Sequence, residues 1–183
     1  MFIAYIFLAF SGMHKVFFGS LKDISMKIIG VTALIGIVLG LFFYLVKEPV
    51  PNYLLMGTLS DIAFYTIILS ISEQIIFSGF LFNIYRKLTN DKDVYFQVAT
   101  IFVLFHLLRF ENLVISYFKN FDFSYLYLIT AYYILLFIFM LTALYLYSFK
   151  SKKYKGNFVY PVILHFVTDL TLFVVLMLSG GYL

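Results

Sequence analysis

Long apolar runs separated by short charged segments dominate this chain. The clearest run, 28–46, is uncharged and lies between Lys27 and Lys47. A run of about 20 apolar residues is long enough to cross a bilayer as a helix. Other apolar runs occupy 62–85, 94–108, 123–149 and 157–183, and a shorter one occupies 1–13. The pattern predicts an all-α, polytopic transmembrane helix bundle of five to six spans, the number depending on whether 1–13 crosses the membrane.

The segments between the runs are expected to lie at the membrane surface. Pro49 and Pro51 interrupt the chain before 53–61, which we expect to be an interfacial lead-in. The stretch 86–93 carries several charges and predicts a loop, and 113–118 predicts a surface helix. Within the first clear span, Gly36 and Gly40 lie four residues apart, a spacing that permits close helix packing.

Composition supports a membrane protein and excludes several other classes. The 183 residues are 63% hydrophobic and 12% charged, whereas soluble domains carry about 25% charged residues. The chain is therefore expected to form a single membrane-embedded domain over 1–183, with the lipid bilayer as its surroundings. It contains no cysteine, which excludes disulfides and thiolate chemistry. The net charge of +4 is explained by cytoplasmic loops, and no nucleic-acid partner is expected.

The distribution of basic residues predicts an orientation. With six spans, one side of the membrane receives only Lys47, Arg109 and Lys119 of the 13 Lys and Arg residues. The other side receives Lys15, Lys22, Lys27, Arg86, Lys87, Lys92, Lys150, Lys152, Lys153 and Lys155. The richer side is predicted to be cytoplasmic. Abundant Phe, Ile, Tyr and Lys are typical of an AT-rich genome, so we expect a multi-pass protein of a bacterial cytoplasmic membrane.

Apart from tyrosines, four ionisable side chains lie inside the predicted spans. A charge at the bilayer centre costs about 3 kcal/mol or more, so it usually has a partner or a function. At about 1.5 Å rise per residue, Glu73, His106 and Asp169 lie roughly 20 Å from the basic end of their helices, and His165 lies roughly 15 Å from it. His165 and Asp169, four residues apart, share a helix face. Three helices therefore bring these groups to similar depth, which predicts one polar site.

Three short motifs in this chain resemble those of the CAAX-protease and bacteriocin-processing family (CPBP, or Abi) of intramembrane endopeptidases. The family's motifs are Glu-Glu-x-x-x-Arg, Phe-x-x-x-His and His-x-x-x-Asn/Asp. They correspond to 73–79, 102–106 and 165–169, each on its own predicted helix, within a core of about 60–175. Gln74 replaces the second Glu and Ser78 replaces the Arg. Since a whole ion pair is replaced, neither charge is left without its partner.

The resemblance implies an intramembrane endopeptidase that acts on a membrane-associated peptide or protein and requires no cofactor. Glu73 would be the general base, with His106 orienting the attacking water. His165 and Asp169 would face the oxyanion. An ionised Asp169 would repel that oxyanion, so we expect it to hold a protonated His165 that makes the contact.

Two other functions fit the sequence. A catalytically inactive relative would act through helix–helix contacts, in bacteriocin immunity or as a membrane regulator, and Gln74 and Ser78 favour this alternative. A metal or proton transporter, or a zinc-dependent protease, would use the same four residues, because two imidazoles and two carboxylates suit Zn²⁺. Transporters usually show internal repeats, and no convincing repeat is present. The sequence indicates no oligomeric state.

Overall fold

The computed structural model describes residues 24–47, 58–89, 91–107, 123–148 and 156–180, and every regular element within them is helical. The elements are α3 (Met26–Leu45), α5 (Leu59–Gln74), the π-helix η1 (Ile75–Leu81), α6 (Phe82–Leu88), α7 (Asp91–Leu107), α9 (Phe123–Ser148) and α10 (Val159–Ser179). In this part of the chain 4 helices are long and apolar enough to cross a membrane, and α7 is a shorter apolar helix. The predicted all-α membrane bundle is confirmed. The segments 1–13 and 113–118 lie outside the described residues.

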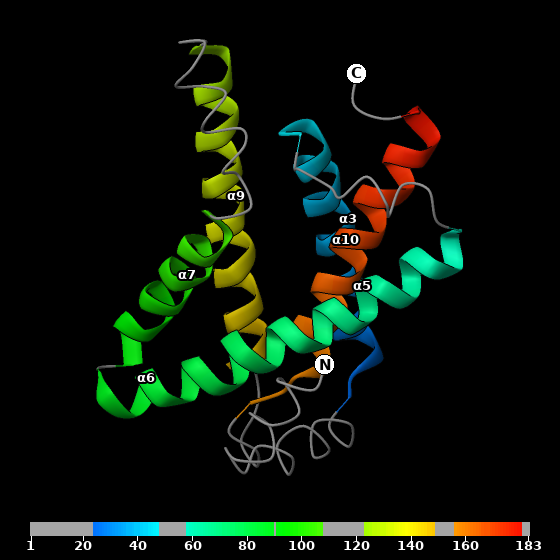
Figure 1. The fold of residues 1–183 in the computed structure, drawn as a ribbon. Helices are drawn as coiled ribbons and strands as arrows, with labels where there is room; N and C mark the ends of the chain where they lie inside the picture. The colour runs from blue at the N-terminus through cyan, green and yellow to red at the C-terminus, as the bar shows by residue number, and fades with distance from the viewer. Residues whose placement is uncertain (1–23, 48–57, 90, 108–122, 149–155, 181–183) are drawn as a thin grey trace.

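The long helix formed by α5, η1 and α6 crosses the other helices (Figure 1). Helix α10 packs most extensively against α3 and also against α5, while α7 packs against α9. Figure 1 shows α3 and α10 side by side, with α7 and α9 forming a second pair. The two pairs meet where α10 contacts α9 and where the long helix runs past both. This crossing brings the middle of the long helix close to α7, α9 and α10.

Close packing of α3 on α10 follows from two glycines, as the sequence predicted. A Cβ atom on Gly36 would lie 3.0 Å from the Leu164 carbonyl oxygen, and one on Gly40 would lie 2.5 Å from the Thr168 carbonyl oxygen. Both distances are shorter than ordinary van der Waals contact, so the absence of a side chain lets the two backbones approach. In a membrane the hydrophobic effect does not drive helices together, so association relies on van der Waals packing, which small residues allow by letting the backbones approach.

Three predicted boundaries differ from the observed ones. Part of the expected lead-in, from Leu59 to Asp61, already belongs to α5, because Thr58 and Asp61 form a capping box at its start. The expected charged loop 86–93 is mostly helical: α6 continues to Leu88 with basic residues in its last turn, and α7 begins at Asp91. Such charges favour these helix ends rather than breaking them.

The third difference is the end of the last helix. The apolar run predicts a span to residue 183, but α10 ends at Ser179. Gly180 follows in the left-handed conformation, with φ 71°, which stops a helix in the way glycine commonly does.

Hydrogen bonds tie several helix ends together on one side of the bundle. The Tyr160 hydroxyl accepts from the Ser25 backbone N–H at the start of α3, at 3.0 Å. The Tyr147 carbonyl, near the end of α9, accepts from the Asn157 N–H at 2.7 Å, and the Asn83 amide donates to the Tyr147 hydroxyl at 2.9 Å. The start of α3, α6, the end of α9 and the start of α10 therefore share one end. The loops predicted to be cytoplasmic adjoin that end, and the compartment itself stays a prediction.

Candidate functional site

Glu73 lies at the junction of α5 and η1, in the middle of the long helix. The buried face of α5 is unusually polar, with Thr66, Ser70, Glu73 and Gln74 all buried. Thr66 and Ser70 donate to carbonyls of their own helix, Ala63 O at 3.1 Å and Thr66 O at 2.7 Å. Such local bonds satisfy hydroxyl groups inside a membrane. Glu73 and Gln74, in contrast, face residues of other helices.

The helix changes from α to π immediately after Gln74. Short π segments within α-helices are uncommon and are found frequently at functional sites. In η1, Ile75, Phe77, Ser78 and Gly79 are buried, so the change of helix type occurs where the long helix passes through the bundle. The Asn83 side chain donates to the Gly79 carbonyl at 2.6 Å and helps to satisfy the altered backbone.

His106, in the last turn of α7, is held by its own helix. Its Nδ1 lies 2.8 Å from the Phe102 carbonyl oxygen. A carbonyl oxygen only accepts, so Nδ1 carries the hydrogen, and Nε2 of the neutral ring is an acceptor. This Nε2 faces Glu73, with 3.8 Å between Nε2 and Oε2. Both residues are buried, with His106 2% and Glu73 7% exposed.

His165, on α10, approaches the same carboxylate from another direction. Its Nε2 lies 3.8 Å from Glu73 Oε2 and 3.5 Å from Asp169 Oδ2. The structure thus brings together all four ionisable residues that depth counting placed at similar levels, and it confirms that His165 and Asp169 meet across one helical turn. Asp169 is the most exposed of the four, with 18% of its side chain accessible.

Gln74 and Ser78 also belong to the site, which sequence reasoning did not foresee. Gln74 Nε2 lies 3.3 Å from His165 Nδ1, and the Ser78 hydroxyl donates to Gln74 Oε1 at 2.5 Å. Both residues are fully buried. The sequence contained a usable signal, since two polar residues four apart in an apolar span need partners inside the bundle. Their contact with His165 depends on how α10 crosses α5, which a single sequence does not specify.

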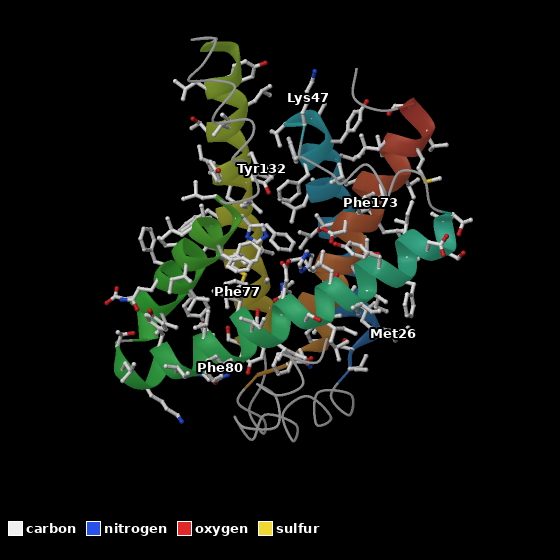
Figure 2. All side chains as sticks on the ribbon, viewed as in Figure 1. Met26, Lys47, Phe77, Phe80, Tyr132 and Phe173 are labelled. Carbon is white, nitrogen blue, oxygen red and sulfur yellow. The ribbon has the colours of Figure 1, made fainter. Side chains whose placement is uncertain are left out.

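Aromatic rings enclose the two histidines. The Phe102 ring packs against the His106 ring with centroids 4.2 Å apart, and the Phe139 ring meets the His165 ring edge-on at 5.0 Å. Phe77 contacts Phe102 edge-on at 4.9 Å. Figure 2 shows the Phe77 side chain within the body of the bundle, where the long helix passes the other helices. In such apolar surroundings electrostatic contacts are stronger than in water.

Among the side chains that the structure describes, no group of three or more His, Asp or Glu residues is arranged to hold a metal ion. The four ionisable groups nevertheless offer complementary chemistry. Glu73 Oε2 lies 3.8 Å from Nε2 of both His106 and His165, distances at which a water molecule can bridge the groups. This arrangement suits proton transfer to and from a bound water.

Comparison with known proteins identifies a family for this chain. The model of the family described as "Type II CAAX prenyl endopeptidase Rce1-like" matches residues 55–171, well over half of the chain. The matched segment contains every residue of the site described above. A search of curated proteins found no match, and neither did a search of solved structures. This match over residues 55–171 shows that the chain belongs to the Rce1-like family of type II CAAX prenyl endopeptidases.

Proposed function

We propose that this protein is an intramembrane endopeptidase that hydrolyses a peptide bond in a membrane-associated peptide or protein. The observation that supports this most is the position of Glu73 Oε2, 3.8 Å from Nε2 of both His106 and His165. These separations are too long for direct hydrogen bonds. Polar groups at this distance are commonly bridged by water.

A water beside Glu73 and His106 would meet two acceptors. Glu73 Oε2 accepts as a carboxylate, and His106 Nε2 accepts because Nδ1 donates to Phe102. Both water hydrogens are then directed at the protein, and an oxygen lone pair is left for a substrate carbonyl. This geometry supports Glu73 as the general base and His106 as the residue that orients the water.

The reaction is an ordinary hydrolysis. The water oxygen bonds to the carbonyl carbon while its proton moves to Glu73, and the carbonyl oxygen becomes an oxyanion. His165 Nε2, also 3.8 Å from Glu73 Oε2, donates to that oxyanion, and Asp169 Oδ2 lies 3.5 Å from the same nitrogen. The C–N bond then breaks, and Glu73 returns the proton to the leaving nitrogen. The products are a carboxylic acid and an amine.

The substrate probes follow from the family's description. A farnesylated peptide ending in Cys-a-a-X tests prenyl-peptide cleavage, and the same peptide without the lipid tests whether the lipid matters. Membrane-associated peptides from cells that produce the wild type or an inactive variant provide an unbiased third probe, because a substrate accumulates when cleavage is lost. Each probe is presented to the purified protein in liposomes.

Glu73→Gln is the decisive variant. It keeps the size of the side chain but removes the base, so cleavage is expected to fall by about 10²–10⁴-fold. Asp61→Asn is the matched control, since it makes the same chemical change in the same helix at an exposed capping residue outside the site. Cleavage at the wild-type rate by Glu73→Gln would exclude Glu73 as the base.

A metal-dependent form of this chemistry, or metal transport, makes a different prediction. If Glu73 acts without a metal, as proposed, elemental analysis of the purified protein is expected to find no stoichiometric metal. A chelator is then expected to leave cleavage unchanged. Bound zinc that is lost together with activity would favour a metal mechanism with Glu73, His106, His165 and Asp169 as ligands.

A second candidate function is a non-catalytic role in bacteriocin immunity or in regulation of a membrane partner through helix–helix contacts. The observation that favours it is the neutral Gln74–Ser78 pair, which stands where the family carries Glu and Arg. Simultaneous substitution of Glu73, His106 and His165 would leave such a role intact. An intact cellular phenotype with this variant, correctly inserted, would favour the second function over the first.

A further inference from the structure

Gln74, which is bonded to Ser78, contacts His165 on the side opposite the two carboxylates. Gln74 Nε2 lies beside Nδ1, whereas Glu73 and Asp169 lie beside Nε2. We propose that Gln74 and Ser78 are positioning residues that hold His165 as a neutral imidazole with its hydrogen on Nε2. The position of this hydrogen is a property of the His165 ring and can be measured without any substrate. Only its effect on an oxyanion rests on the proposed function.

The direction of each hydrogen bond follows from the chemistry of the groups. The Ser78 hydroxyl donates to Gln74 Oε1, so the amide oxygen is turned toward Ser78 and the amide nitrogen toward His165. An amide nitrogen only donates, so Nδ1 must accept. A neutral ring that accepts at Nδ1 carries its hydrogen on Nε2. A protonated ring carries hydrogens on both nitrogens and would place two donors against each other.

The surroundings of Nε2 agree with this assignment. Among the described residues, the carboxylates of Glu73 on α5 and Asp169 on α10 lie on the Nε2 side, at 3.8 and 3.5 Å. Carboxylates are negatively charged acceptors, so a hydrogen on Nε2 is favoured there over a lone pair, directly or through a bridging water. Other described neighbours include the Phe139 ring on α9, which contacts the His165 ring, and His106 on α7, which shares the Glu73 carboxylate. The neutral ring differs from the protonated His165 expected from the sequence.

Burial keeps this arrangement in place. Gln74 and Ser78 are 0% exposed and His165 is 5% exposed, so bulk water does not compete for the amide. The pair also differs from the other buried hydroxyls of this helix. Ser70 bonds to the backbone of its own helix, whereas Ser78 bonds to the side chain that reaches α10. Ser70 is therefore a matched control for Ser78.

Nitrogen-15 NMR of the histidine rings tests the proposal directly, because protonated and unprotonated ring nitrogens have widely separated shifts. The chain contains 3 histidines, so His14→Gln and His106→Gln variants assign the His165 signals. In the wild type, His165 is expected to show an unprotonated Nδ1 and a protonated Nε2, and His106 the reverse. A hydrogen on His165 Nδ1 in the wild type would overturn the proposal, whatever the activity of the protein.

Two variants sharpen the result. Gln74→Glu presents only acceptors to the ring, so the hydrogen is expected to appear on Nδ1. Ser78→Ala removes the donor that orients the amide, and the Nδ1 signal is expected to shift toward the protonated form, while Ser70→Ala leaves it unchanged. If neither Gln74→Glu nor Ser78→Ala moves the signal, the pair does not set the tautomer. The spectrum needs no substrate, so failure of the proposed hydrolysis leaves this test intact.

Discussion

The two histidines of this site share one carboxylate but differ in what holds their other nitrogen. His106 Nδ1 faces a backbone carbonyl of its own helix, whereas His165 Nδ1 faces the Gln74 amide of another helix. A carbonyl only accepts and an amide nitrogen only donates. The two Nε2 atoms that flank Glu73 therefore have opposite character, an acceptor at His106 and a donor at His165.

The difference shows how one residue type serves two tasks within a small site. An acceptor beside Glu73 suits a water that must lose a proton, and a donor suits an oxygen that gains charge. The His106 orientation comes from bonding within its own helix, so it depends little on the rest of the fold. The His165 orientation depends on the crossing of α5 and α10, and on a buried amide and hydroxyl between them.

The largest test of this comparison substitutes each histidine by Ala and by Gln. Both His106 variants are expected to lose about 10²–10⁴-fold in cleavage rate. Ala offers no acceptor, and the amide of a Gln side chain turns its NH2 donor, not its oxygen, toward the carboxylate of Glu73. His165→Ala is expected to lose about 10²–10³-fold, as for removal of one oxyanion donor. His165→Gln is expected to recover part of that loss, since its amide N–H can donate. Cleavage kinetics in liposomes measure all four variants.

The pattern across these variants matters more than any single rate. Recovery by Gln at position 165 together with no recovery at position 106 supports a donor and an acceptor, respectively. Equal recovery at both positions, or at neither, would contradict the opposite roles. Thermal unfolding of each variant in detergent controls for loss of folding.

Much of the fold was predictable from the sequence because lipid imposes a simple rule on helix length and polarity. The predicted run 28–46 differs from α3 (Met26–Leu45) by only a residue or two at each end. The meeting of Glu73, His106 and His165 was predictable for a related reason: costly groups in a membrane gather, and their depth follows from helical rise. Family motifs then indicated which residues belong together.

The contacts between helices were the part that sequence did not reveal. The π-helix at Ile75–Leu81 carries no sequence signal of its own. The charges within 86–93 predicted a loop, although α6 continues to Leu88 and α7 begins at Asp91. Gln74 and Ser78 were noticed only as departures from a motif. The bond from Gln74 to His165 depends on the distance and angle between two helices, which the spacing along one chain does not specify.

A smaller test addresses the packing that places His165. Gly40→Ala would put a Cβ atom 2.5 Å from the Thr168 carbonyl oxygen, so α10 must shift. Overpacking of this kind costs about 1–3 kcal/mol. Gly30→Ala is the matched control on the same helix, since its Cβ would meet nothing within 4 Å, and it is expected to be neutral or stabilising by about 0.5–1 kcal/mol. Thermal unfolding midpoints compare the two.

The cleavage rate provides a second comparison between the Gly40→Ala and Gly30→Ala variants. A shift of α10 moves His165 and Asp169 but leaves His106 on α7 in place, so Gly40→Ala is expected to lower the cleavage rate and to alter the His165 ring signals while those of His106 stay unchanged. Unaltered His165 signals in a destabilised Gly40→Ala protein would show that the site does not depend on this packing.

The smallest expected effect comes from Asp169→Asn. An asparagine keeps a polar side chain beside His165 Nε2, which lies 3.5 Å from Asp169 Oδ2 in the wild type, and its amide can donate to an oxyanion that a carboxylate would repel. The cleavage rate of this variant is therefore expected to equal or exceed that of the wild type, whereas Asp169→Ala, which loses the contact with His165, is expected to be slower. If Asp169→Asn instead falls to the rate of Asp169→Ala, the negative charge itself is required. His165 would then act as a protonated ring held by Asp169, and the contrast between the two histidines would lie in charge rather than in tautomer.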